Sequence, residues 1–155
     1  MNAPACSVCA AHEPRAEFVA WESPRWILRH HPYPAPLCGW FLLCARRHVA
    51  SAADLDAEEA REFTHVLGAC MRALRTSAQV PRVYVVMFGE GAPHLHAHLI
   101  PRDPACEGTR AWAVADWYRA VERGERAPAL PEAVEGVISL MRARLTDELA
   151  SFTHA

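Results

Sequence analysis

The alternation of apolar and polar residues predicts five strands and one long helix in the first two thirds of the chain. Apolar runs of strand length lie at residues 18–21, 26–28, 40–44, 83–88 and 94–100. Between the third and fourth runs, apolar residues recur at the spacing of one helical face; they are Phe63, Val66, Leu67, Cys70, Met71 and Leu74. Asp56 and Glu59 have the spacing of a capping box at the start of this helix. This order predicts an α+β fold, a mainly antiparallel five-stranded sheet with a packed helix.

The last third of the chain has a different character. A loop with proline, glycine and a lone cysteine follows residue 102, and Trp112, Trp117 and Tyr118 then crowd one segment. These aromatic residues either cover the sheet or stack on a nucleobase. Four apolar residues at helical spacing predict a last helix; they are Val134, Ile138, Met141 and Leu145.

Length and composition agree with one domain. A chain of 155 residues can bury a single core, and we interpret residues 1–155 as an N-terminal lead (1–17), a core (18–102) and a C-terminal helical extension (103–155). The net charge of −2 gives no electrostatic footprint for bulk nucleic acid. The phosphates of a nucleotide ligand would therefore be bound by charged residues near the site and not by the net charge of the protein.

The sequence also bears on the compartment in which the protein works. No apolar run approaches the ~18–20 residues of a membrane span, and the N-terminus has no basic-then-apolar signal. We therefore expect a cytoplasmic protein without a membrane partner. Six cysteines in such a protein are expected to be reduced or metal-bound rather than paired in disulfides.

Three histidines at alternate positions, His94, His96 and His98, are the strongest chemical signal. In an extended strand they point to one face, while the apolar residues between them point to the other. The outer two Cα atoms would be about 13 Å apart, a span that strains a single metal ion and suits an extended phosphate chain. A histidine can also act as a nucleophile. A phosphate-centred site is the leading interpretation, with a metal on the row and a structural cluster as alternatives.

This run resembles a known family. The segment from His94 to Ile100 matches the His-φ-His-φ-His-φ-φ signature of the histidine triad (HIT) superfamily, in which φ is apolar. The following Pro101-Arg102 resembles the ending found in bacterial dinucleotide polyphosphate hydrolases. The segment from Gly39 to Val49 is similar to the Gly-His-φ-φ-φ-φ-Pro-Lys/Arg-x-His-φ segment of the family. The resemblance covers roughly Phe18 to Arg102, and it implies the HIT fold, a nucleotide or dinucleoside polyphosphate ligand and a homodimer.

The resemblance also implies a mechanism. His96 corresponds to the nucleophile, which attacks the α-phosphorus of a nucleotide and forms a covalent nucleotidyl-histidine. His98 would donate to the phosphate oxygens, and His94 would buttress the row. Arg102 and either Arg46 or Arg47 are candidates for the remaining phosphates. The expected enzyme is a nucleotide hydrolase or nucleotidyltransferase that cleaves a phosphoanhydride or a phosphoramidate bond.

Cys6 and Cys9 have the C-x-x-C spacing of half a tetrahedral zinc site. A redox disulfide is an alternative, although such motifs belong between a strand and a helix. An unmetallated pair is another. In the family resemblance, an N-terminal Cys pair is completed by two histidines, which correspond here to His48 and His94. The implied structural zinc ligands are therefore Cys6, Cys9, His48 and His94, and His12 is a candidate to replace one of them.

The chain departs from the family pattern at three places. Trp40 stands where many members have a fourth histidine. The loop from Gly89 to Pro93 carries Glu90 where many members have hydrogen-bond donors, so Glu90 would bind ribose or carry a proton. A ribose-binding acidic residue is replaced around His30 and His31. These departures keep open an alternative, a non-catalytic nucleotide-binding or zinc-stabilised interaction module. A metalloenzyme with its metal on the histidine row is a third interpretation.

Overall fold

The centre of the fold is one sheet of five antiparallel strands in the order β1-β2-β3-β5-β4. The computed structural model describes residues 6–10 and 16–152. The strands are β1 (Val19–Glu22), β2 (Trp26–His30), β3 (Phe41–Ala45), β4 (Arg82–Val86) and β5 (His96–Arg102). The predicted α+β class and the predicted five-stranded antiparallel sheet are confirmed.

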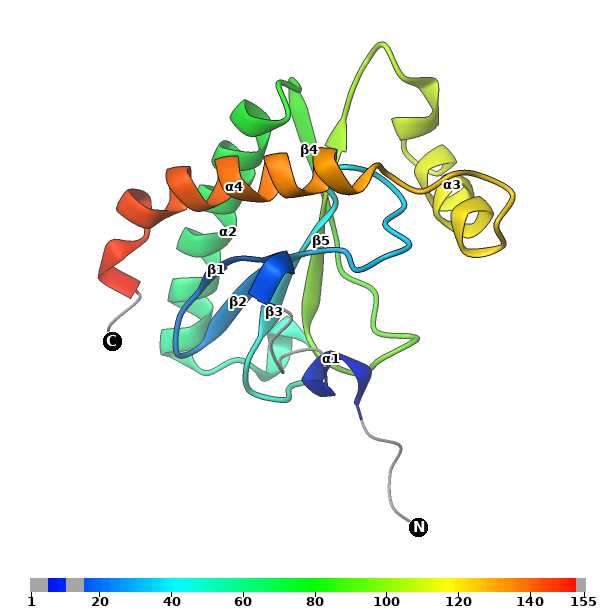
Figure 1. Cartoon of the computed structure of the whole chain (residues 1–155). Coiled ribbons are helices and arrows are strands. Elements are labelled where there is room, and N and C mark those ends of the chain that lie inside the picture. Colours follow the sequence, from blue (N-terminus) through cyan, green and yellow to red (C-terminus); the bar gives the residue numbers. More distant parts are fainter. Residues whose placement is uncertain (1–5, 11–15, 153–155) are drawn as a thin grey trace.

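One face of the sheet is covered by two helices, α2 (Ala57–Ser77) and α4 (Pro131–Glu148), which lie together in Figure 1. The core between the sheet and these helices is apolar, because alternate residues of the strands meet the apolar faces of both helices. Leu43 and Leu99 from the sheet, Val66 from α2 and Met141 from α4 are all fully buried there. Of the helices in the part of the chain that the structure describes, none is long and apolar enough to cross a membrane.

The opposite face carries two smaller apolar clusters. One joins Val8 of α1 (Ser7–Ala10) to β2 and β3. The other joins Val114 of α3 (Ala113–Glu122) to Trp40 and Ile100. His96 and His98 lie on this face, because they pair with Cys44 and Leu42 across the β3–β5 ladder. Short 3₁₀ helices complete the chain at Ala16–Phe18, Ala52–Asp54, Glu107–Thr109 and Ala150–Phe152.

The predicted capping box is present at the start of α2. The Asp56 side chain accepts hydrogen bonds from the N–H groups of Glu58 and Glu59, and the Glu59 side chain accepts one from the Asp56 N–H. Glu59 thereby satisfies a donor that the first helical turn leaves without a partner.

The predicted start of the histidine strand is wrong. The chain bends before the strand, since the His94 N–H donates to the Ala92 carbonyl at 2.7 Å and the Leu95 N–H donates to Val49 at 2.6 Å. β5 therefore begins at His96, and His94 lies outside it. The apolar alternation continues through the bend, which is why the pattern alone suggested a longer strand.

His30 closes the loop that joins β2 to β3. Its ring is fully buried, Nδ1–H donates to the His31 carbonyl at 2.9 Å, and Nε2 accepts from the Gly39 N–H at 2.9 Å. Gly39 has a φ of +83°, a conformation that other residues adopt only with strain. Burial lowers the pKa of His30 to about 4, so the folded protein holds this imidazole neutral.

Lowering the pH from 6.5 to 4 should reduce the free energy of unfolding, because unfolded His30 takes up a proton that folded His30 excludes. The contribution of His30 is complete above pH 6.5 and loses up to about 3 kcal/mol as the pH falls to 4. A His30→Gln variant keeps a donor and an acceptor but does not titrate, so its urea unfolding should depend less steeply on pH. His65→Gln, at an exposed position of α2, is the matched control. An unchanged slope in His30→Gln would contradict this assignment.

Candidate functional site

His96 and His98 form a pair of adjacent rings on the β5 face. Their ring centroids are 5.1 Å apart in an edge-on arrangement, and both side chains are partly exposed. β3 and β4 flank them, since Leu42 of β3 and Val86 of β4 both pair with His98. The predicted row of three histidines is therefore a row of two.

The protonation pattern of His96 follows from one hydrogen bond. Nδ1 lies 2.6 Å from the His94 carbonyl oxygen, and a carbonyl only accepts, so Nδ1 carries the proton. In the neutral ring Nε2 then holds a lone pair. His96 is arranged to use Nε2 as a base or as a nucleophile.

His98 has the opposite arrangement. The indole Nε1–H of Trp40 donates to His98 Nδ1 at 3.0 Å, so the neutral His98 ring carries its proton on Nε2. Burial, together with the nearby His96 and His31, lowers the pKa of His98 to about 4. His98 is therefore a neutral hydrogen-bond donor beside the lone pair of His96.

His94 is turned away from this pair and lies in a separate cluster. Its ring is fully buried, and Nε2–H donates to the Ala45 carbonyl at 2.6 Å. Nδ1 lies 3.3 Å from the sulfur of Cys9 and 3.6 Å from that of Cys6. The sequence predicts that His94 buttresses the histidine row, and its contacts are of that kind: its backbone carbonyl accepts from His96, and its ring contacts the two cysteines.

The four ligands implied by the sequence come together. One side-chain atom from each of Cys6, Cys9, His48 and His94 lies within 4.8 Å of the others, and His48 Nδ1 is 3.3 Å from the Cys9 sulfur. Tetrahedral zinc with two thiolates and two imidazoles separates neighbouring ligand atoms by about 3.3–3.8 Å, so the contacts fit a zinc ion. The bond from His94 Nε2 to Ala45 leaves Nδ1 for the metal, an outer contact typical of metal-bound histidines. His12, the candidate replacement, lies outside the described residues.

The two thiols differ in acidity. Burial raises the pKa of Cys6, but bonds from the Cys9 and Val8 N–H groups outweigh that effect and lower it overall. Burial and the neighbouring Cys6 raise the pKa of Cys9. A bound cation would favour the thiolate form of both residues.

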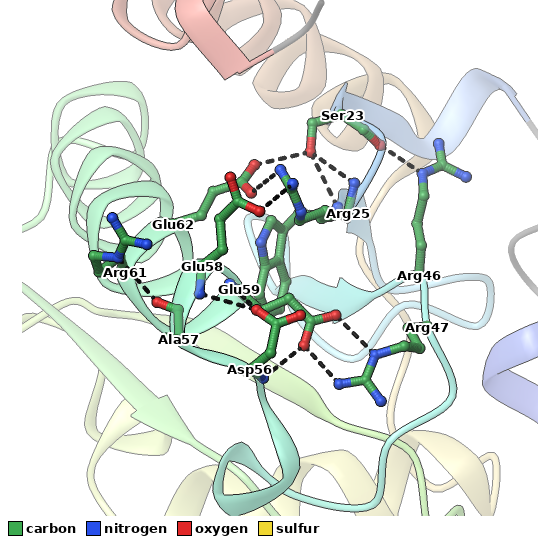
Figure 2. Close-up of polar contacts among 11 residues, drawn as sticks. Ser23, Arg25, Arg46, Arg47, Asp56, Ala57, Glu58, Glu59, Arg61 and Glu62 are labelled. Carbon is green, nitrogen blue, oxygen red and sulfur yellow. Dashed lines mark hydrogen bonds and ion pairs between the residues drawn. The ribbon is translucent and has the colours of Figure 1, made fainter. Parts of the chain in front are cut away.

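Two of the arginines predicted to meet phosphates are held by the protein's own groups (Figure 2). Arg47 forms two bonds to the Glu59 carboxylate, at 2.8 and 2.6 Å, and these bonds lower the pKa of Glu59 to about 2. Arg46 pairs with Glu22 and donates to the Ser23 carbonyl at 2.7 Å. Both guanidinium groups thus fix the turn after β3, which carries the candidate ligand His48.

The other two predicted substrate-binding residues are Arg102 and Glu90. Arg102, at the end of β5, donates to the Cys106 carbonyl at 3.1 Å and to the Thr109 hydroxyl at 3.0 Å. It therefore orders the loop that leads to α3. Glu90 is exposed in the loop between β4 and His94. The contacts of Arg102 thus point to the α3 loop and not to His96 or His98.

Sequence reasoning missed Arg29 and did not predict the contacts of Trp40 and Tyr118 at this site. Trp40 bonds to His98, and Tyr118 of α3 packs on Trp40 with ring centroids 5.6 Å apart. Arg29 of β2 lies in the same cross-strand row as Leu42 and His98, and its charge adds to the effect of burial in lowering the pKa of His94. The alternation of Trp40, Leu42 and Cys44 could have placed Trp40 on the site face, but strand order and register cannot be read from one strand.

Comparison with known proteins agrees with this geometry. The sequence matches the family model for the HIT domain over residues 17–105. No curated protein matches the chain significantly.

Several solved structures share the fold. A Zn-bound histidine triad family protein from Mycobacterium smegmatis is 17% identical, with a TM-score of 0.64 over 95% of this chain and 97% of that chain. A hypothetical histidine triad nucleotide-binding protein from Sulfolobus tokodaii is 14% identical, with a TM-score of 0.65 over 97% and 100%. The Plasmodium falciparum diadenosine triphosphate hydrolase is 15% identical, with a TM-score of 0.58 over 86% and 80%. Because the domain model covers more than half of the sequence, the chain belongs to the HIT family.

Proposed function

We propose that the protein is a nucleotide hydrolase or nucleotidyltransferase that acts at the α-phosphate through a covalent intermediate on His96. The observation that carries this proposal is the pair of opposite tautomers, with an Nε2 lone pair on His96 beside an Nε2–H donor on His98. A nucleophile and a fixed donor side by side meet the needs of phosphoryl substitution, which gains most from positioning and charge stabilisation.

The proposed reaction has two displacements. The lone pair of His96 Nε2 forms a bond to the α-phosphorus, while the bond to the leaving group breaks and its electron pair departs with that group. The His94 carbonyl stabilises the imidazolium character that His96 gains, since it accepts the Nδ1–H. Water or another acceptor then attacks phosphorus, the P–N bond returns its electrons to Nε2, and the attacking oxygen loses its proton to solvent.

Family membership supports the substrate class. The HIT family comprises nucleotide-binding proteins, and one protein of similar fold is a diadenosine triphosphate hydrolase. A nucleotide or a dinucleoside polyphosphate is therefore the proposed small-molecule partner. The exposed Glu90 in the loop before His94 favours a second candidate, a non-catalytic nucleotide-binding or zinc-stabilised interaction module, because an ionised carboxylate donates no hydrogen bond to a leaving group.

We propose that Cys6, Cys9, His48 and His94 bind a structural zinc ion. Four protein ligands close the coordination sphere, so such an ion would stabilise the fold rather than take part in chemistry. The name of the Mycobacterium smegmatis neighbour, a Zn-bound protein, supports the choice of metal.

We also propose that the protein is a cytoplasmic homodimer. The six cysteines are free thiols, as expected in a reducing compartment. β4 is an edge strand that pairs with β5 alone among the described strands, and the exposed Met87 and Phe88 follow it. The C-terminal helix α4 packs on α2 and on β1, at the other edge of the sheet. A second copy that covers the β4 edge would remove a strand edge that is prone to aggregation.

Replacing His96 with asparagine should abolish turnover of a dinucleoside polyphosphate while nucleotide binding remains, because the attacking nitrogen is lost and a polar side chain is kept. Acid-sensitive, alkali-stable nucleotidyl adducts should map to His96 by mass spectrometry. His98→Asn should slow turnover by roughly 10²–10³ and keep the adduct, and His65→Asn should match the wild type. Wild-type turnover in His96→Asn would disprove the covalent mechanism. Binding without turnover in the wild type would favour the binding module.

The purified protein should contain about one zinc ion per chain by elemental analysis. Cys6→Ser should weaken zinc binding by ~100-fold or more and lower the melting temperature, because it removes a direct ligand. Cys106→Ser, a change to a partly buried thiol outside the cluster, should keep both properties. Chelated, zinc-free protein with an unchanged melting temperature would rule out a structural ion.

Sedimentation equilibrium at micromolar concentration should give the mass of a dimer. Phe88→Glu should weaken the association at least tenfold, because it places a charge beside the β4 edge. Leu130→Glu, at another exposed apolar residue, should not change the association. A monomer at tens of micromolar for the wild type would exclude this interface.

A further inference from the structure

The bond from Trp40 to His98 has consequences for which substrates the site can cleave. An indole N–H donates and never accepts. The Trp40 Nε1–H points to His98 Nδ1 at 3.0 Å, so Nδ1 must hold a lone pair and the ring proton must sit on Nε2. His98 can donate to a substrate through Nε2 while Nδ1 stays occupied by the indole.

The orientation of Trp40 is fixed from several sides. The residue is only 5% exposed and packs with Ile100 of β5 and Val114 of α3. The Tyr118 ring of α3 lies 5.6 Å from the indole, and the His31 ring lies 6.1 Å from it. The indole cannot turn away from His98 without disturbing the contact between α3 and the sheet.

A second proton on His98 would meet the Trp40 N–H. It would have to sit on Nδ1, where two donors would face each other. The surrounding groups also disfavour the charge: burial, His96 on the same strand and His31 from the β2–β3 loop lower the pKa of His98 to about 4. From α3, Tyr118 packs on Trp40 and Glu122 lies near Tyr118 and His31. Burial and Glu122 raise the pKa of Tyr118 to about 12. His98 therefore stays neutral at physiological pH.

A neutral donor of this kind limits the leaving group. When His96 Nε2 attacks a phosphoanhydride, the P–O bond breaks and the electron pair leaves on a weakly basic phosphate oxygen that needs no proton. When it attacks a phosphoramidate, the P–N bond breaks and the electron pair would leave on a strongly basic nitrogen unless that nitrogen first gains a proton. Such proton transfer contributes roughly 10²–10⁴ in rate when an acid is present.

Among the described residues, two other histidines near His98 do not supply that proton. His96 Nδ1–H is bonded to the His94 carbonyl, and His31 Nδ1–H is bonded to the Pro32 carbonyl. Burial lowers the pKa of His31 as well, so this ring is not a reservoir of protons at neutral pH.

We propose that Trp40 is a positioning residue that holds His98 as a fixed Nε2–H donor, and that the site consequently cleaves nucleoside phosphoanhydrides and not phosphoramidates with alkylamine leaving groups. The substrate class rests on the function proposed above, whereas the state of His98 does not. A titratable side chain at position 40 could exchange a proton with His98, whereas the indole of Trp40 only donates a hydrogen bond.

Nitrogen-15 NMR of the histidine rings tests the positioning claim without any substrate. Wild-type His98 should show the Nε2–H tautomer and remain neutral from pH 8 to pH 5. Trp40→Phe should give a mixture of tautomers and a pKa closer to 6.5, while Trp112→Phe, at the exposed N-cap residue of α3, should leave the His98 signals unchanged. Protonation of His98 Nδ1 in the wild type within this pH range would overturn the claim. This result comes from the wild type alone, so it does not depend on whether a variant folds.

Paired kinetics test the substrate class. Diadenosine triphosphate and an adenosine 5′-phosphoramidate of an alkylamine present the same nucleoside and the same α-phosphorus. The wild type should favour the anhydride in kcat/KM by at least about 10², and Trp40→His should narrow that ratio at least tenfold. Equal rates for the two substrates in the wild type would overturn the substrate class. If neither substrate is cleaved, the proposed function fails together with the substrate class, and the NMR result alone then decides the role of Trp40.

Discussion

The candidate site depends on one buried residue, His94, and on its polar contacts. The ring donates from Nε2 to the Ala45 carbonyl, which ties it to the end of β3. The other ring nitrogen faces the sulfurs of Cys6 and Cys9. The backbone carbonyl accepts the Nδ1–H of His96. A single residue therefore links the sheet, the cysteine cluster and the proposed nucleophile.

Sequence patterns predicted the fold well and the contacts of the site only in part. The α+β class, the sheet and the Asp56–Glu59 capping box followed from periodicity and spacing that act over a few residues. The bend at His94 did not, because it is set by hydrogen bonds to Val49 and Ala92 that interrupt no apolar alternation. The partners of Arg46 and Arg47 were equally hidden, since Glu22 and Glu59 lie on separate elements that only the tertiary fold brings together.

The C-terminal extension, whose role could not be derived from its composition, has two separate functions in packing. α4 completes the core on one face of the sheet together with α2. α3 lies on the other face, where Val114 and Tyr118 contact Trp40 beside the histidine pair. The tryptophans of this segment differ in their surroundings: the Arg126 guanidinium carbon lies 3.4 Å from the ring centroid of Trp117, whereas Trp112 is 83% exposed. Through α3, the C-terminal extension contacts Trp40, and Trp40 in turn bonds to His98.

The most direct test of the account is a crystal structure of the zinc-loaded protein with a nucleoside monophosphate. The account predicts the α-phosphorus within about 3.5 Å of His96 Nε2, with a phosphate oxygen accepting from His98 Nε2. It also predicts tetrahedral zinc on Cys6, Cys9 and the Nδ1 atoms of His48 and His94. A phosphate bound away from both histidines of β5, or a metal ion held by His96, would contradict it.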